Sequence, residues 1–113
     1  MVKIVYNNCY GGFRMSDKGV ELYKKLYREK YKKRCKLADE LLYVGISIKR
    51  HDPILVKTVE ILGKDASGQF SELAIMEIRD MEYRIAHESG KEYVETPFNI
   101  KWTMVEPEVL LEQ

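Results

Sequence analysis

The sequence predicts an α+β fold: a single small domain in which two main helices pack on a mainly antiparallel β-sheet. Three observations lead to this prediction. The chain has 113 residues, which is enough for one hydrophobic core and too few for two domains. Two segments place apolar residues at helical spacing next to recognisable caps. Several short apolar or alternating segments, separated by turn residues, indicate strands.

The first strand is predicted at residues 2–6, where β-branched and aromatic residues suggest burial on both faces. Asn7 and Asn8 end it, and the glycine pair that follows favours a turn. Ser16 is the expected N-cap of a helix over 17–34. The apolar stripe of this helix is made largely of tyrosines, at positions 23, 27 and 31. Because tyrosine is an unusual core residue, we expect this face to be only partly dry.

Residues 35–49 leave two alternatives open. Residues 37–43 either extend the first helix or form a second, short one. The alternation over 44–48 predicts a short strand. The next element is much clearer, because Asp52 is an N-cap, Pro53 occupies the first helical position and Gly63 follows the last turn. These signals predict a helix from Pro53 to Leu62.

The C-terminal half is predicted to be mostly strands. A strand is expected at 73–79, followed by a hairpin in which 83–87 pairs with 91–95 around Gly90. A final strand is expected at 100–105, with residues 107–113 as a frayed tail. Such a sheet leaves at least one strand edge to be covered, which slightly favours a homodimer.

The charge is distributed unevenly although the net charge is only +1. Residues 17–36 hold nine Lys or Arg and three acidic residues, whereas 57–113 hold six basic and twelve acidic residues. A solvated charged helix is favoured over a nucleic-acid-binding one, because the basic residues run most of the way round the helix. No apolar run has the roughly 20 residues needed to span a bilayer. We therefore expect a cytoplasmic protein with neither a membrane nor a nucleic acid as partner.

The loop after the first strand and the start of the second main helix are the candidate ligand sites. A strand, a glycine loop and a capped helix start can place free backbone N–H groups at an anion. The expected ligand-binding residues are Tyr10, Gly11, Gly12, Phe13, Arg14, Ser16, Arg50 and His51. In this hypothesis two helix starts point at one anionic ligand, a nucleotide or similar signal, and an aromatic ring stacks on its base. The alternative is that the glycines form a simple corner and that Ser16 and Asp52 only cap helices.

Catalysis is less favoured than binding. His51 could act as an acid or base, and Cys9 follows a strand and precedes a helix start, so a small hydrolase or transferase remains an alternative. Cys9 and Cys35 are expected to be free thiols, because a disulfide framework or a zinc site needs more cysteines at paired spacings. We expect no metal and no cofactor.

Four stretches together resemble a set of small proteins encoded by tailed phages and some large DNA viruses. They are NNCYGGFRMSDKGVELY, RHDPILVKTVEILGKDASG, SELAIMEIRD and YRIAHESGKEYVET, and the similarity runs from Lys3 to about Glu106. These proteins have no established activity, so no functional residue is transferred. The resemblance implies a viral accessory protein in the host cytoplasm. Its expected roles are to sequester a nucleotide signal of host immunity or, alternatively, to bind and inhibit a host enzyme.

Overall fold

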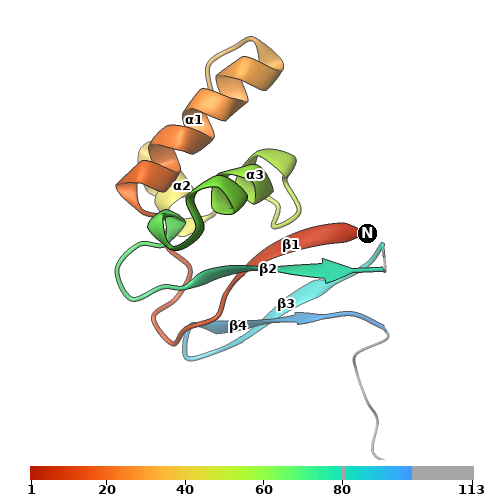
Figure 1. Cartoon of the computed structure of the whole chain (residues 1–113). Helices are drawn as coiled ribbons and strands as arrows, with labels where there is room; N and C mark the ends of the chain where they lie inside the picture. Colours follow the sequence, from red (N-terminus) through yellow and green to blue (C-terminus); the bar gives the residue numbers. More distant parts are fainter. Residues whose placement is uncertain (80, 98–113) are drawn as a thin grey trace, which may run out of the picture.

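A computed structural model describes residues 1–79 and 81–97 of the chain. These residues form an α+β domain, which confirms the predicted fold class (Figure 1). Along the chain the elements are β1 (Val2–Asn7), α1 (Asp17–Tyr31), α2 (Asp39–Val44), α3 (Pro53–Leu62), the short 3-10 helix η1 (Gly63–Ala66), β2 (Leu73–Ile78), β3 (Arg84–Glu88) and β4 (Lys91–Glu95). The strand expected at 100–105 and the tail expected at 107–113 lie outside the described residues.

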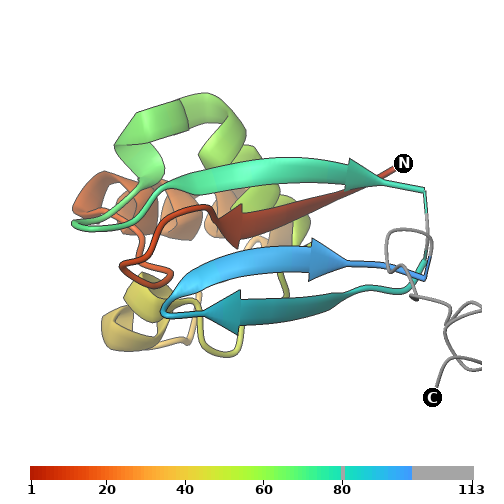
Figure 2. The same cartoon turned by 90° about the horizontal axis from the view of Figure 1, so that it is seen from below.

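The strands lie side by side in the order β2, β1, β4, β3, and each runs opposite to its neighbour (Figure 2). β1 pairs with β2 along its whole length. β3 and β4 form the predicted hairpin, whose turn residues Ser89 and Gly90 have φ angles of 51° and 90°. Positive φ at both positions is what a tight two-residue hairpin turn requires. The helices all lie on one side of the β1–β2 pair (Figure 1).

β1 is buried on both faces, as its composition predicted. Ile4 and Val5 are adjacent in sequence and point to opposite faces, yet both are fully buried. Val5 belongs to the larger apolar cluster, which includes Leu55 of α3. Ile4 belongs to a smaller cluster on the other face, with Ile78 and Val94. β1 is therefore the strand around which both layers assemble.

Helix α1 begins as predicted. The Ser16 hydroxyl oxygen accepts the backbone N–H of Gly19 at 3.0 Å, which satisfies one of the donors that a helix start leaves free. Val20 and Tyr23 are buried on its inner face. Tyr31, at the end of the stripe, is exposed. The tyrosine face is thus buried at the start of the helix and exposed to solvent at its end.

The end of α1 differs from the prediction. The helix was expected to run to residue 34, but it ends at Tyr31 because Lys32 adopts a left-handed conformation with φ of 57°. This turn reverses the chain, so that Cys35 becomes buried and Leu37 packs on the larger core cluster. Burial of these two side chains outweighs the helical preference of the lysines and arginines around them.

The segment after α1 settles the alternatives left open by the sequence. Residues 39–44 form the short helix α2, while the strand predicted at 44–48 is wrong. Gly45 and Ser47 both adopt left-handed conformations, with φ of 72° and 69°, which no extended strand accommodates. Ile48 is still buried, whereas Ile46 points into solvent. The apolar alternation therefore belongs to an irregular turn.

Helix α3 has the predicted bounds. The Asp52 carboxylate accepts the N–H of Ile54 at 2.8 Å, and Pro53 occupies the first turn. Gly63 ends the helix with φ of 55°. Leu55 is fully buried. Local signals in the sequence were sufficient for this element.

Candidate functional site

The loop that follows β1 meets two other loops, and glycines make this meeting possible. A side-chain carbon on Gly11 would lie 1.7 Å from the carbonyl oxygen of Phe70. One on Gly90 would lie 2.6 Å from the backbone nitrogen of Gly12. Since neither distance leaves room for an atom, these positions require glycine. We call this meeting point, formed by residues 10–12, 70 and 89–90, the glycine corner. Close packing accounts for Gly11 and Gly90, whereas Gly12 has open space around it and a φ of 86°.

Arg50, which precedes α3, is engaged by Glu92 of β4. Both oxygens of the Glu92 carboxylate accept N–H groups of the guanidinium, one of them at 2.8 Å. The guanidinium carbon also lies 4.1 Å from the centre of the Phe13 ring. The Arg50 and Glu92 side chains are only 16% and 9% exposed. The structure thus brings Phe13 and Arg50 together, but in a largely buried bidentate ion pair in which the arginine charge is already neutralised.

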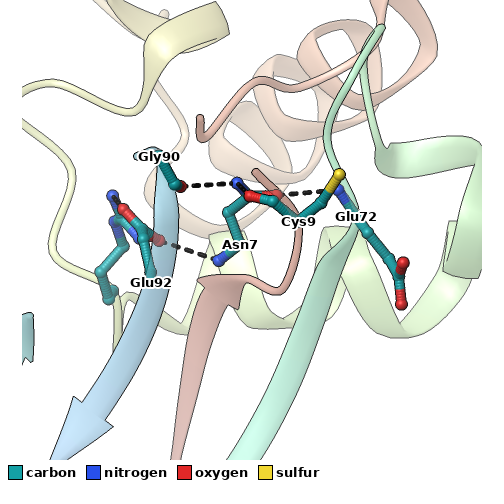
Figure 3. A network of polar contacts seen from close by, with 6 residues as sticks. Asn7, Cys9, Glu72, Gly90 and Glu92 are labelled. Atoms are coloured by element: carbon teal, nitrogen blue, oxygen red, sulfur yellow. Dashed lines mark hydrogen bonds and ion pairs between the residues drawn. The ribbon is translucent and has the colours of Figure 1, made fainter. Parts of the chain in front are cut away.

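Asn7, the last residue of β1, is fully buried and connects three segments (Figure 3). Its backbone N–H donates to Glu92 at 2.8 Å, and its side-chain amide donates to the carbonyl oxygens of Cys9 and Gly90 at 2.7 and 2.9 Å. Its side-chain oxygen accepts the N–H of Glu72 at 2.8 Å. Both amide hydrogens and the oxygen are therefore used. Sequence reasoning missed this role, because an asparagine after a strand more often starts a turn.

The two helix starts lie at opposite ends of the helical layer (Figure 1). The Ser16 hydroxyl at the start of α1 donates to the carbonyl oxygen of Asp65 in η1. Asp52, at the start of α3, instead accepts a hydrogen bond of 2.6 Å from the hydroxyl of Tyr23 in the second turn of α1. Both caps thus have partners within the protein, and the convergence of the two helix starts on one anion stays a prediction.

The other candidate residues also have protein partners or lie apart. Arg14 lies over the ring of Tyr43, with 5.2 Å between its guanidinium carbon and the ring centre. The Nδ1 atom of His51 lies 2.6 Å from the hydroxyl oxygen of Tyr83, whose pKa is raised by burial. Tyr10 is 63% exposed in the glycine corner. These contacts do not converge on one ligand.

Cys9 and His51 are not joined by any contact in the described residues that would suit catalysis. Cys9 and Cys35 are free thiols. Within residues 1–79 and 81–97, no group of three or more His, Cys, Asp or Glu side chains is placed to hold a metal ion. The enzymatic alternative remains a prediction without a defined set of groups.

A different region gathers positive charge. Two adjoining hollows, of about 370 and 400 Å³, lie between the second half of α1 and the segment that folds back after Lys32. Lys24, Arg34 and Cys35 line both hollows. The first hollow adds Glu21, Lys25 and Arg28, and the second adds residues 36–39. We call the two hollows together the basic cleft.

The basic cleft contains more cations than its own carboxylates can neutralise. Its charged side chains are Lys24, Lys25, Arg28, Arg34, Lys36, Glu21 and Asp39. Lys24 forms an ion pair with Asp39 at 2.6 Å. Among the described residues, none of the other four cations forms an ion pair. The cleft therefore presents a net positive field to solvent.

Stabilisation of helix α1 accounts for the position of only one of the five cations of the basic cleft. Arg28 lies in the last turn of α1, where the negative end of the helix dipole favours positive charge. Lys24 and Lys25 precede that turn, and Arg34 and Lys36 follow the helix. The sequence indicated a solvated charged helix, and the structure adds the folded-back segment that turns one side of this helix into a cleft.

Comparisons with known proteins find no match. No protein-family model, no curated protein and no solved structure matches this chain. None of the described helices is long and apolar enough to cross a membrane. Function is therefore inferred from the geometry of the chain itself.

Proposed function

We propose that this protein binds a small phosphorylated ligand, such as a nucleotide or a nucleotide-derived signal, without chemical turnover, and that the basic cleft is the binding site. The observation that supports this proposal is the set of five cations around two adjoining hollows that hold only two carboxylates. Unpaired, like-charged side chains repel one another, and an anion between them removes that repulsion.

The cleft offers suitable chemistry for phosphate. Arg28 and Arg34 carry planar guanidinium groups that match phosphate oxygens in a two-pronged geometry, while Lys24 adds a compact charge. Each charge-assisted hydrogen bond of this kind is worth about 1.5–3 kcal/mol, with exposed ones near the lower value. The hollow volumes of about 370 and 400 Å³ fall in the range of about 300–1,000 Å³ found for small-molecule sites.

An origin in a tailed phage or a large DNA virus, as the sequence resemblance implies, would give the proposal a biological setting. In an infected cell, a binding protein of this type would lower the free concentration of a nucleotide signal without consuming it. The site differs from the one expected around Tyr10 and Arg50, because Glu92 already neutralises Arg50. The class of ligand stays the same, whereas the residues that bind it change.

Calorimetric titration with a panel of nucleotides tests this function. The double variant Arg28→Gln with Arg34→Gln removes two cations of the cleft. The matched control, Lys18→Gln with Lys33→Gln, removes the same charge from exposed residues that do not line the hollows. We expect the first variant to lose about a hundredfold in affinity and the control to change by about twofold at most. Equal losses in both variants would show that only net charge matters and would reject the cleft.

A second candidate function, protein–protein interaction, is favoured by one observation at the glycine corner. Phe70 is 73% exposed and held in a left-handed conformation with φ of 61°. Tyr10 is exposed nearby, and Tyr93 is partly exposed. The Lys91 ammonium lies 5.4 and 5.6 Å from the centres of these two tyrosine rings. Exposed aromatic residues of this kind are enriched at the centres of protein interfaces.

The simplest partner for the glycine corner is a second copy of the chain. The homodimer predicted from the sequence rested instead on an uncovered strand edge. Light scattering at micromolar concentration should then give twice the monomer mass of 13.3 kDa. The variant Tyr10→Ser with Phe70→Asn should give the monomer mass. A monomeric wild-type protein would reject self-association through this corner.

A further inference from the structure

The basic cleft is divided into two hollows, and each hollow has cations of its own. Lys25 and Arg28 line only the first hollow, and Lys36 lines only the second. Lys24 and Arg34 stand between them and line both. From this division we infer that the ligand carries two phosphoryl groups separated by a spacer, one group in each hollow. This inference rests on the proposed function and makes its ligand class more specific.

The distribution of charge favours separated phosphates over a continuous phosphate chain. A di- or triphosphate chain placed in the first hollow would leave Lys36 without a partner, and one placed in the second would leave Lys25 and Arg28 without one. Two phosphates on a spacer engage both sets and share Arg34. Because a guanidinium has five N–H donors, Arg34 can serve two phosphates at the same time.

The uncharged residues of the cleft suit a spacer that is not itself charged. Cys35 is buried and lines both hollows, and the partly buried Leu37 lines the second. A sugar ring or a nucleoside presents carbon atoms and hydroxyl groups to such a surface. A ribose bearing phosphates on two different hydroxyls therefore fits walls that carry both charged and apolar residues.

In the second hollow, the Asp39 carboxylate competes with a phosphate of the ligand for Lys24. Its carboxylate lies 2.6 Å from the Lys24 ammonium, and the two side chains are 52% and 35% exposed. Ion pairs this exposed are weak, so an incoming phosphate displaces the carboxylate from Lys24. Removing the carboxylate should consequently tighten binding of a ligand that reaches the second hollow.

Calorimetric titration of the whole protein with two probes tests the inference. The first probe is adenosine 3′,5′-bisphosphate, and the second is adenosine triphosphate, which has the same base and a single continuous phosphate chain. We expect the bisphosphate to bind about tenfold more tightly or better, although the triphosphate carries one more phosphate. Equal or tighter binding of the triphosphate would overturn the inference and leave the proposed function standing. If neither probe binds, both the proposed function and the inference fail.

Variants in the second hollow provide an independent readout. Lys36→Gln should weaken the bisphosphate about tenfold and leave the triphosphate within about twofold. Asp39→Asn should tighten the bisphosphate by about three- to tenfold, whereas the charge-matched control Glu40→Gln should change it by less than about twofold. Equal gains from both substitutions would show a general charge effect and overturn the inference. Affinity for single-stranded oligonucleotides that keeps rising with length would also overturn it, in favour of a nucleic-acid ligand.

Discussion

Next to the glycine corner, the Arg50 guanidinium meets the carboxylate of Glu92 inside the protein, whereas in the basic cleft Arg28 and Arg34 face solvent. Both regions contain arginine side chains, but only in the first is the arginine buried and paired with a carboxylate. Folding itself provides the partner of Arg50, so that arginine is explained by stability. For Arg34, no ion pair is found in the described part of the chain. A charge that folding leaves unpaired is the better indication of a ligand.

The same contrast appears in how the regions are held together. Asn7 uses both of its side-chain N–H bonds and its oxygen to fix loops around the glycine corner. The basic cleft is bounded instead by long lysine and arginine side chains, with one exposed ion pair between Lys24 and Asp39. The corner is therefore rigid through satisfied polar groups, while the cleft can adjust its side chains to an anion.

The largest expected effect comes from breaking the buried ion pair. Glu92→Ala leaves the Arg50 charge buried without its partner and should destabilise the protein by about 3–5 kcal/mol. Glu95→Ala is the matched control, since Glu95 pairs with the exposed Arg84 on the same hairpin, and it should cost about 0–1 kcal/mol. Urea unfolding measures both values. Similar costs for the two variants would contradict the structural role of the Arg50–Glu92 pair.

The next effect concerns the contact between α1 and the start of α3. Tyr23→Phe removes the hydrogen bond to the Asp52 carboxylate and should cost about 1.5–3 kcal/mol. Tyr27→Phe, in the same helix, is the control and should cost less than about 0.5 kcal/mol. Urea unfolding at neutral pH distinguishes the two variants. Equal losses of stability would show that the Tyr23–Asp52 hydrogen bond does not stabilise the domain.

The Tyr23 contact also predicts a pH dependence. Burial, followed by the hydrogen bond to Asp52, raises the pKa of Tyr23 above its ordinary value. The protonated Tyr23 side chain therefore contributes its full share of the folding stability below the unfolded-state pKa of about 10. This stability is lost as the pH rises above that value. Tyr23→Phe should flatten this alkaline decline in unfolding free energy, and an unchanged slope would contradict the assignment.

A smaller effect of opposite sign is expected at Phe70. Its left-handed conformation costs about 1–2 kcal/mol for an ordinary residue, and asparagine tolerates this conformation better. Because the side chain is mostly exposed, Phe70→Asn should stabilise the protein by about 0.5–1 kcal/mol. Thermal unfolding measures the change. A loss of stability would show that the Phe70 ring packs on the corner rather than projecting from it.

The fold was predictable where local signals determine structure. Asp52, Pro53 and Gly63 specify both ends of α3, and the Ser89–Gly90 turn specifies the hairpin. The end of α1 was not predictable, since the left-handed turn at Lys32 is stabilised by burial of Cys35 against residues distant in sequence. The strand expected at 44–48 failed for a related reason, because Ser47 adopts a conformation that its own sequence does not favour.

The candidate site was predictable only in part. The excess of basic residues over 17–36 is visible in the sequence, but the cleft exists because residues 34–39 fold back along α1. The pairing of Arg50 with Glu92 was invisible, since 42 positions separate the two residues. Without that contact, Arg50 appeared to be a free ligand-binding group beside a helix start.

The most direct test of the basic cleft is one set of melting curves, recorded with and without a saturating concentration of adenosine 3′,5′-bisphosphate. The proteins are the wild type, the variant Arg28→Gln with Arg34→Gln, and the control Lys18→Gln with Lys33→Gln. Without ligand we expect all three to lie within about 1 kcal/mol in stability, since the replaced side chains have no ion-pair partners in the described structure and the helix dipole favours Arg28 only modestly. With ligand, the melting temperature should rise for the wild type and the control and stay unchanged for the cleft variant. A cleft variant that is stabilised by the ligand as much as the control would contradict a ligand-binding role for these cations.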